Sequence, residues 1–137
     1  MTADFLRTPQ DPAELFALCK KALAAFETYR NAARDAAGTQ AAAAPGGADE
    51  CQRELHGLAW VATYAASLGA LLGWAEQLED AGEFGRLEAL ILRVAFGEYL
   101  DQATTGISMS QVEFARPSDL GLEDRAARLR ADPACAE

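Results

Sequence analysis

The sequence predicts an all-α protein, a small antiparallel helical bundle with three main helices, an extended segment and a short C-terminal helix. Three observations support this fold class. The 137 residues are 50% apolar and 24% charged, which is the composition of one soluble globular domain. Much of the apolar share is alanine, a strong helix former, while β-branched residues are few. Apolar side chains also recur every three or four residues over long stretches.

The first predicted helix occupies residues 11–36. Asp11 suits an N-cap, Pro12 suits the first helical position, and Glu14 lies in the first turn beside the positive helix end. Its predicted core face comprises Leu15, Leu18, Ala22, Phe26, Tyr29 and Ala33. We therefore assign residues 1–36 to an N-terminal helix. Residues 37–48 are rich in Ala, Gly and Pro without a large apolar anchor, and we predict a flexible linker there.

Residues 49–131 are predicted to form a helical hairpin core with a C-terminal arm. The two hairpin helices are expected at about residues 49–80 and 84–103, with Gly82 in a left-handed helix end between them. On the later helix the expected core side chains are Leu87, Leu90, Ile91, Val94, Ala95 and Tyr99, with Leu92, Phe96 and Leu100 on an adjoining strip. Residues 107–117 suit an extended segment or one short turn of helix better than a further bundle helix. A short helix carrying three arginines is expected to follow, and residues 132–137 are expected to form a frayed tail.

The first hairpin helix contains 21 residues without formal charge, from Leu55 to Ala75. This length permits a membrane span, but polar side chains interrupt the stretch and its flanks are acidic, so we predict a bundle helix and no membrane span. Its small residues Ala65, Gly69 and Gly73 would let another helix approach closely. Two interpretations of its wide apolar surface stay open, a tight core and a protein–protein interface.

Charge and cysteine content narrow the function classes. The net charge of −9, from 12 basic and 21 acidic residues, disfavours binding to nucleic acid and to anionic lipid. Cys19, Cys51 and Cys135 are widely spaced and accompany a single histidine, so neither a disulfide framework nor a metal site is predicted. The first residues lack a secretory signal, and a cytoplasmic location is the expectation.

No catalytic residue is predicted from the sequence. The single histidine, His56, lies in an apolar helical stretch, and the carboxylates near residue 80 indicate a solvated turn. Phosphate-loop, dinucleotide-binding and nucleophile-elbow motifs are absent from the sequence. If the bundle interior binds a small molecule, its candidate polar groups are His56, Thr63, Tyr64 and Ser67.

Four blocks of the sequence share their order and spacing with a known family. They are residues 55–64, 71–76 and 96–100, and a block containing residues 109–111, Glu113 and residues 116–121. In these blocks the chain resembles the helical N-terminal extension of methylsuccinyl-CoA dehydrogenase-like flavoproteins of the acyl-CoA dehydrogenase family. The resemblance covers residues 55–122, and it does not extend to the flavin-binding body that follows the extension in that family. It therefore carries over no catalytic residue, and we expect FAD only in a partner.

The resemblance implies a non-catalytic helical accessory or interaction subunit that associates with an acyl-CoA dehydrogenase-like flavoprotein or with itself. The expected interaction surface comprises Trp60, Tyr64, Trp74, Phe96, Met109, Gln111, Phe114 and Arg116. Two alternatives stay open: a self-associating helical bundle that binds a small acyl ligand, and a fragment of a longer acyl-CoA dehydrogenase. The start at Met1 and the tapering end favour a separate polypeptide over a fragment.

Overall fold

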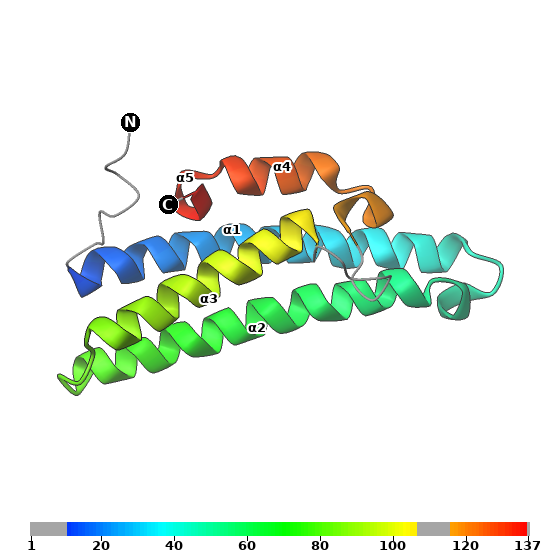
Figure 1. Cartoon of the computed structure of the whole chain (residues 1–137). Helices are drawn as coiled ribbons and strands as arrows, with labels where there is room; N and C mark the ends of the chain where they lie inside the picture. Colours follow the sequence, from blue (N-terminus) through cyan, green and yellow to red (C-terminus); the bar gives the residue numbers. More distant parts are fainter. Residues whose placement is uncertain (1–10, 107–115, 137) are drawn as a thin grey trace.

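Helices make up all the regular structure in residues 11–106 and 116–136, the part of the chain that the computed structural model describes (Figure 1). The elements are α1 (Pro12–Ala43), η2 (Gly47–Glu50), α2 (Gln52–Asp80), α3 (Arg86–Thr105), η3 (Pro117–Leu120), α4 (Glu123–Ala131) and α5 (Pro133–Ala136). The two long helices α1 and α2 lie side by side, α3 packs on both, and α4 contacts α1 and α3. The predicted all-α bundle is confirmed. Most of the segment predicted as extended, residues 107–115, lies outside the described residues.

The start of α1 follows the local signals of the sequence. The Asp11 carboxylate accepts a hydrogen bond from the Ala13 N–H at 3.0 Å, and Pro12 occupies the first helical position. The buried side chains of α1 recur at three- and four-residue intervals: Leu15, Cys19, Ala22, Phe26, Tyr29, Ala33 and Ala37. Five of the six predicted core positions are confirmed, and Cys19 is buried where Leu18 was expected.

The helix α1 continues to Ala43, so the prediction of a linker is wrong for residues 37–43. Alanine and glutamine propagate a helix well, and the single Gly38 costs only about 1 kcal/mol in a helix interior. Tertiary contacts also hold this stretch. Ala37 is fully buried, and the Gln40 side-chain amide donates to the backbone carbonyl of Asp119 at 3.3 Å. The helix ends only at the Pro45 turn, where Gly47 adopts a φ of +62°.

A tight turn joins α2 to α3 and makes them antiparallel. Gly82 has a φ of +72°, and the N–H of Glu83 donates to the Leu78 carbonyl at 2.8 Å, which closes the end of α2 as predicted. The Phe84 ring packs edge-on against Phe16 of α1, with the centroids 5.0 Å apart. The Gly85 N–H then donates to the Glu88 carboxylate at 3.0 Å and starts α3.

The predicted orientation of α3 is wrong. Its buried residues are Leu92, Phe96, Leu100, Ala103 and Thr104. The side chains expected in the core include four that are exposed: Leu87, Leu90, Ile91 and Val94. The physical reason lies in how each strip continues along the helix. The strip with Leu92 continues into Leu100 and Ala103, whereas the strip with Leu87 and Val94 continues into Glu98 and Asp101, whose burial without partners would be costly.

The Asp119 carboxylate is one of the groups that tie the C-terminal arm to the long helices. Asp119 of η3 accepts hydrogen bonds from the Arg53 guanidinium at 2.9 Å and from the Arg116 N–H at 2.7 Å. Within the segment predicted as a frayed tail, residues 133–136 form the short helix α5, and the Asp132 carboxylate accepts from the Ala134 N–H at 2.9 Å. Asp132 thus starts this last helix as Asp11 starts the first.

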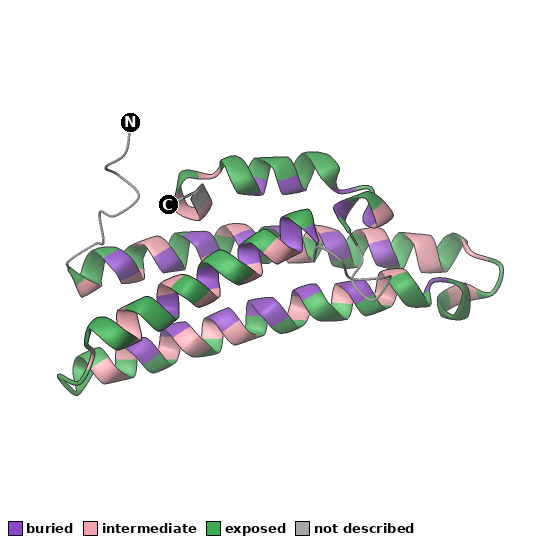
Figure 2. Ribbon diagram, viewed as in Figure 1, coloured by how far each residue is buried: buried purple, intermediate pink, exposed green. Residues whose placement is uncertain are grey.

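The core lies where α1, α2 and α3 meet, and Figure 2 shows it as the buried side of each helix. Phe26, Leu68 and Leu92 are fully buried there, one from each helix. Gly69 of α2 does not impose the close approach to α1 that its size suggested, because a methyl group at this position would lie 3.8 Å from Leu23. By length and composition α2 is apolar enough to cross a membrane, a test that core helices of soluble proteins also pass.

Candidate interaction surface

The outer side of α3 carries a row of exposed apolar side chains. Their exposed fractions are 64% for Leu87, 44% for Leu90, 41% for Ile91 and 61% for Val94, and we call these four residues the α3 stripe. Spacings of three and four residues place them on one face of the helix. The opposite face holds Leu92 and Phe96 in the core. Figure 2 shows the outer side of α3 as largely exposed.

Trp74 of α2 lies near the same end of the hairpin as the α3 stripe. Tyr64 of α2 stacks on Tyr99 of α3 with the ring centroids 4.4 Å apart, which fixes how the two helices are paired. Because the helices are antiparallel, Trp74, ten residues further along α2, lies level with residues 87–91. Its side chain is 36% exposed. Five of the six large hydrophobic residues exposed in the described part of the chain therefore gather at one end of the hairpin.

Carboxylates border the α3 stripe at both ends. Glu79, Asp80 and Glu83 lie at the hairpin turn, Glu88 lies in the first turn of α3, and Glu98 and Asp101 lie beyond Val94 on α3. Residues 79–101 contain only two basic side chains, Arg86 and Arg93. The apolar surface consequently has an acidic rim.

An aromatic row continues along α2 toward its N-terminal end. The Trp60 indole N–H donates to His56 Nε2 at 2.9 Å, and the Trp60 ring lies edge-on to Tyr64 with the centroids 5.8 Å apart. The Tyr64 hydroxyl donates to the side-chain oxygen of Gln102 on α3 at 2.7 Å. Burial, together with neighbouring Tyr99, raises the pKa of Tyr64, so its hydroxyl stays protonated. The contacts of Tyr64 with Gln102 and Tyr99 join α2 to α3.

The residues predicted as an interaction surface divide into three groups. Trp60 and Trp74 are exposed, and so is Arg116 at the start of η3. Tyr64 and Phe96 are each only 5% exposed and belong to the core, so the surface prediction is corrected for them. Three residues lie outside the described part of the chain: Met109, Gln111 and Phe114.

The four polar groups predicted to line an interior pocket do not come together. His56 and Thr63 are exposed on α2, Ser67 is half-buried, and Tyr64 is engaged with Gln102. The Thr63 hydroxyl donates to its own helix, at the Ala59 carbonyl 2.8 Å away. The pocket prediction is therefore wrong for these residues, because the exposed side of α2 carries two of them away from the bundle interior.

A small cavity lies elsewhere, between α3, α4 and α5. Its volume is about 100 Å³, and its lining residues are Gly97, Leu100, Asp101, Thr104, Leu129, Arg130 and Cys135. Sites for drug-sized ligands usually enclose about 300–1,000 Å³. This cavity is too small to enclose an acyl-CoA molecule.

Reactive groups are scattered in the described residues. Burial raises the pKa of the Cys19 thiol to about 11, and burial together with Asp132 raises the pKa of Cys135 to about 11. Both thiols are therefore protonated at neutral pH. Within residues 11–106 and 116–136, no three His, Cys, Asp or Glu side chains gather in a way that would hold a metal ion.

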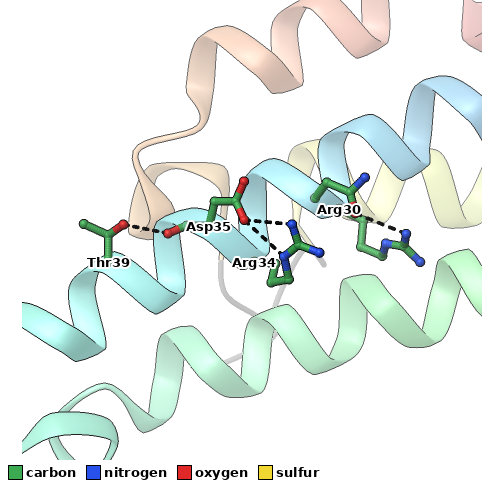
Figure 3. A network of polar contacts seen from close by, with 5 residues as sticks. Arg30, Arg34, Asp35 and Thr39 are labelled. Atoms are coloured by element: carbon green, nitrogen blue, oxygen red, sulfur yellow. Dashed lines mark hydrogen bonds and ion pairs between the residues drawn. The ribbon is translucent and has the colours of Figure 1, made fainter.

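The polar network on α1 is a local surface feature (Figure 3). Arg34 forms a 2.9 Å ion pair with the adjacent Asp35, and both side chains are largely exposed. The Thr39 hydroxyl donates to the Asp35 carbonyl one turn earlier at 2.8 Å. Such exposed pairs contribute at most about 1 kcal/mol. These contacts lie on the surface of α1 alone and bring no groups together from different elements.

The α3 stripe was missed as a surface because it has the same helical spacing as a core face. One signal in the sequence identifies it. Leu87, Val94 and Asp101 follow one another at seven-residue intervals, so they lie on the same face of the helix. A face that ends in Asp101 is harder to bury than one that continues into Leu100 and Ala103.

Comparison with known proteins links the chain to part of a longer enzyme. No protein-family profile matches the chain. Over 100 residues, which are 73% of the chain, the sequence is 47% identical to the (2S)-methylsuccinyl-CoA dehydrogenase of Cereibacter sphaeroides. The chain spans only 18% of the length of that protein.

Proposed function

This chain matches a small part of a longer acyl-CoA dehydrogenase, and we propose that it acts as a non-catalytic helical accessory subunit of such an enzyme. In this role it associates with a flavin-containing catalytic body and contributes no reacting group. The observation that carries the proposal is the match itself: 47% identity covers 73% of this chain but only 18% of the dehydrogenase. The catalytic body supplies FAD and the acyl-CoA site.

The distribution of reactive groups supports the non-catalytic part of the proposal. Proton abstraction from an acyl-CoA needs a base positioned beside the bound substrate. Here His56 accepts a hydrogen bond from Trp60 on the outside of α2, and Cys19 is a buried, protonated thiol. The cavity between α3, α4 and α5 is too small for the substrate. The chain's own surface is better suited to contacts with another protein.

The proposal allows two forms of the subunit, which would have the same role. The helical subunit is either a separate polypeptide or a segment of a longer one that also contains the catalytic body. Immunoblotting of cells that express the native gene separates the two cases by mass. A band near 14.6 kDa indicates a separate subunit, and a band several times larger indicates a segment.

Co-purification tests the association. We expect the affinity-tagged chain, isolated from its native cells, to bring down a yellow protein that mass spectrometry identifies as an acyl-CoA dehydrogenase. The recovered complex should show flavin absorbance and reduce a dye when an acyl-CoA is added. The tag fused to an unrelated helical protein of similar charge is the control. Recovery of the chain as a monomer, with no acyl-CoA dehydrogenase above the control, would falsify the proposal.

A ligand titration distinguishes the proposed accessory role from the rival function, in which the isolated chain binds an acyl compound. If the isolated chain binds acyl-CoA itself, thioester should raise its melting temperature in proportion to ligand saturation. We expect no shift with acetyl-, butyryl- or methylsuccinyl-CoA, because the described cavity is about 100 Å³. A saturable upward shift with any of them would favour the ligand-binding bundle.

A further inference from the structure

The strongest unexplained feature of the molecule is the concentration of exposed apolar side chains at the α2–α3 turn. Leu87 and Val94 are 64% and 61% exposed, higher fractions than those of either tryptophan. Large contiguous apolar patches on soluble proteins commonly mark interaction sites. The core of this chain is already complete without the α3 stripe, since Leu92 and Phe96 fill the interior from the other side of the same helix.

The acidic rim argues against a second copy of this chain as the occupant. In a two-fold symmetric pair, the same surface meets itself in reverse. Two α3 stripes packed antiparallel would place Asp80 and Glu83 of one copy opposite Glu98 and Asp101 of the other. Like charges juxtaposed at an interface oppose association. Arg86 and Arg93 are too few to neutralise six carboxylates on each copy.

The same carboxylates favour a partner whose apolar docking face is bordered by positive charge. An apolar surface flanked by lysines and arginines would cover the α3 stripe and pair with the carboxylates at both of its ends. The relative that this chain matches contains about four fifths of its length outside the matched part. A much larger polypeptide is therefore joined to the corresponding segment in that protein.

We infer that the α3 stripe, together with Trp74, is the surface on which the flavoprotein body docks, and that the docking face of that body is apolar with a basic rim. This inference rests on the proposed function. Leu87 and Val94, the most exposed side chains of the α3 stripe, supply most of the apolar contact, and the less exposed Leu90 and Trp74 supply the rest. The carboxylates of Glu83 and Glu98 orient the partner along α3.

Site-specific photocrosslinking in native cells tests the surface separately from the association. A benzophenone amino acid is placed at Val94, and, as controls, at Ala24 of α1 and Ala127 of α4, which are also exposed. We expect an acyl-CoA dehydrogenase adduct only from position 94, either as a separate chain or within the same polypeptide. The crosslinked partner peptide should lie within a few residues of Lys or Arg.

Charge substitutions provide the second measurement. The double variant Leu87→Glu/Val94→Glu should fold normally, because both side chains are mostly exposed. It should lower recovery of the flavoprotein by at least about tenfold. The matched variant Ala24→Glu/Ala127→Glu adds the same charge on other helices and should leave recovery within about twofold. Circular dichroism and melting curves confirm that both variants are folded.

The outcomes separate the two proposals. Co-purification of the dehydrogenase with crosslinks only from position 24 or 127 would leave the proposed function standing and overturn the docking surface. An adduct at position 94 to a second copy of the chain would overturn the choice of occupant. Neither co-purification nor a dehydrogenase adduct at any position would overturn both.

Discussion

At the scale of single residues, the fold depends on a few side chains that connect helices distant in sequence. Tyr29 of α1 is 3% exposed, and its hydroxyl donates to the Ala103 carbonyl near the end of α3 at 3.3 Å. The last carbonyls of a helix lack partners within it, so this hydroxyl stabilises the end of α3. Burial raises the pKa of Tyr29 to about 12 and keeps the donor protonated.

Replacing Tyr29 with Phe removes this one hydrogen bond and keeps the ring. We expect the free energy of unfolding to fall by about 1 kcal/mol. Urea denaturation followed by circular dichroism measures the change. The control is Thr28→Ala, at an exposed neighbour that bonds only within its own helix, at the Ala24 carbonyl, and should cost less than about 0.5 kcal/mol. Equal losses in both variants would show that the bond to α3 contributes nothing.

Cys19 makes the free energy of unfolding depend on pH in the alkaline range. Its pKa rises from 9.0 to about 11 on folding, chiefly through burial, while Arg93 acts in the opposite direction. Because the folded pKa is the higher one, the thiol's contribution is complete below pH 9 and is lost as the pH rises toward 11. In Cys19→Ala this dependence disappears. The stability difference between wild type and variant, measured under reducing conditions, should shrink by on the order of 1 kcal/mol over that range.

At the scale of elements, the orientation of α3 is the decisive feature. Leu92 is fully buried and Val94 is 61% exposed, although they are only two positions apart. Leu92→Ala should lower the free energy of unfolding by about 2–5 kcal/mol, because it leaves a cavity in the core. Val94→Ala should change it by less than about 0.5 kcal/mol. If chemical denaturation gives the larger loss for Val94→Ala, the helix faces the other way.

The continuation of α1 beyond residue 36 is also open to direct measurement. Gly38 is exposed, and a methyl group added there meets no atom within 4 Å. In a helix, Gly38→Ala should raise the free energy of unfolding by about 0.5–1 kcal/mol. In a flexible linker it would change nothing measurable. As the contrasting control, Gly47→Ala places a side chain at a φ of +62° and should destabilise by about 1 kcal/mol.

At the scale of the whole molecule, net charge and the apolar surface act in opposite directions. The charge of −9 keeps copies of the chain apart, while the α3 stripe would draw them together. Sedimentation equilibrium of the purified chain should therefore show a monomer at low ionic strength and weak self-association at about 1 M salt, where charges are screened within about 3 Å. The Leu87→Glu/Val94→Glu variant should stay monomeric in both. A tight dimer at low salt would contradict the argument from the acidic rim.

Local sequence signals were enough to place the start of α1 and the ends of α2 and α3, although they did not reveal the end of α1 or the short helix α5. Asp11 with Pro12 starts α1, and Gly82 and Gly106 end α2 and α3, because caps and turns depend on residues a few positions apart. The 3.6-residue period also identified most of the buried face of α1. The likeness to an acyl-CoA dehydrogenase segment was visible in the same way, from the order and spacing of short blocks.

Packing between the helices, and no local signal, determines which apolar faces are covered. α3 is apolar around much of its circumference, so its periodicity is satisfied by two orientations, and packing against α1, α2 and α4 selects the one that leaves Glu98 and Asp101 in solvent. The same contacts bury Ala37 and carry α1 through a stretch that resembles a linker. Phe96 and Tyr64 entered the core, and Leu87 and Val94 were left outside it. Whether a side chain is buried depends on its neighbours from several helices, and a local sequence pattern does not specify those neighbours.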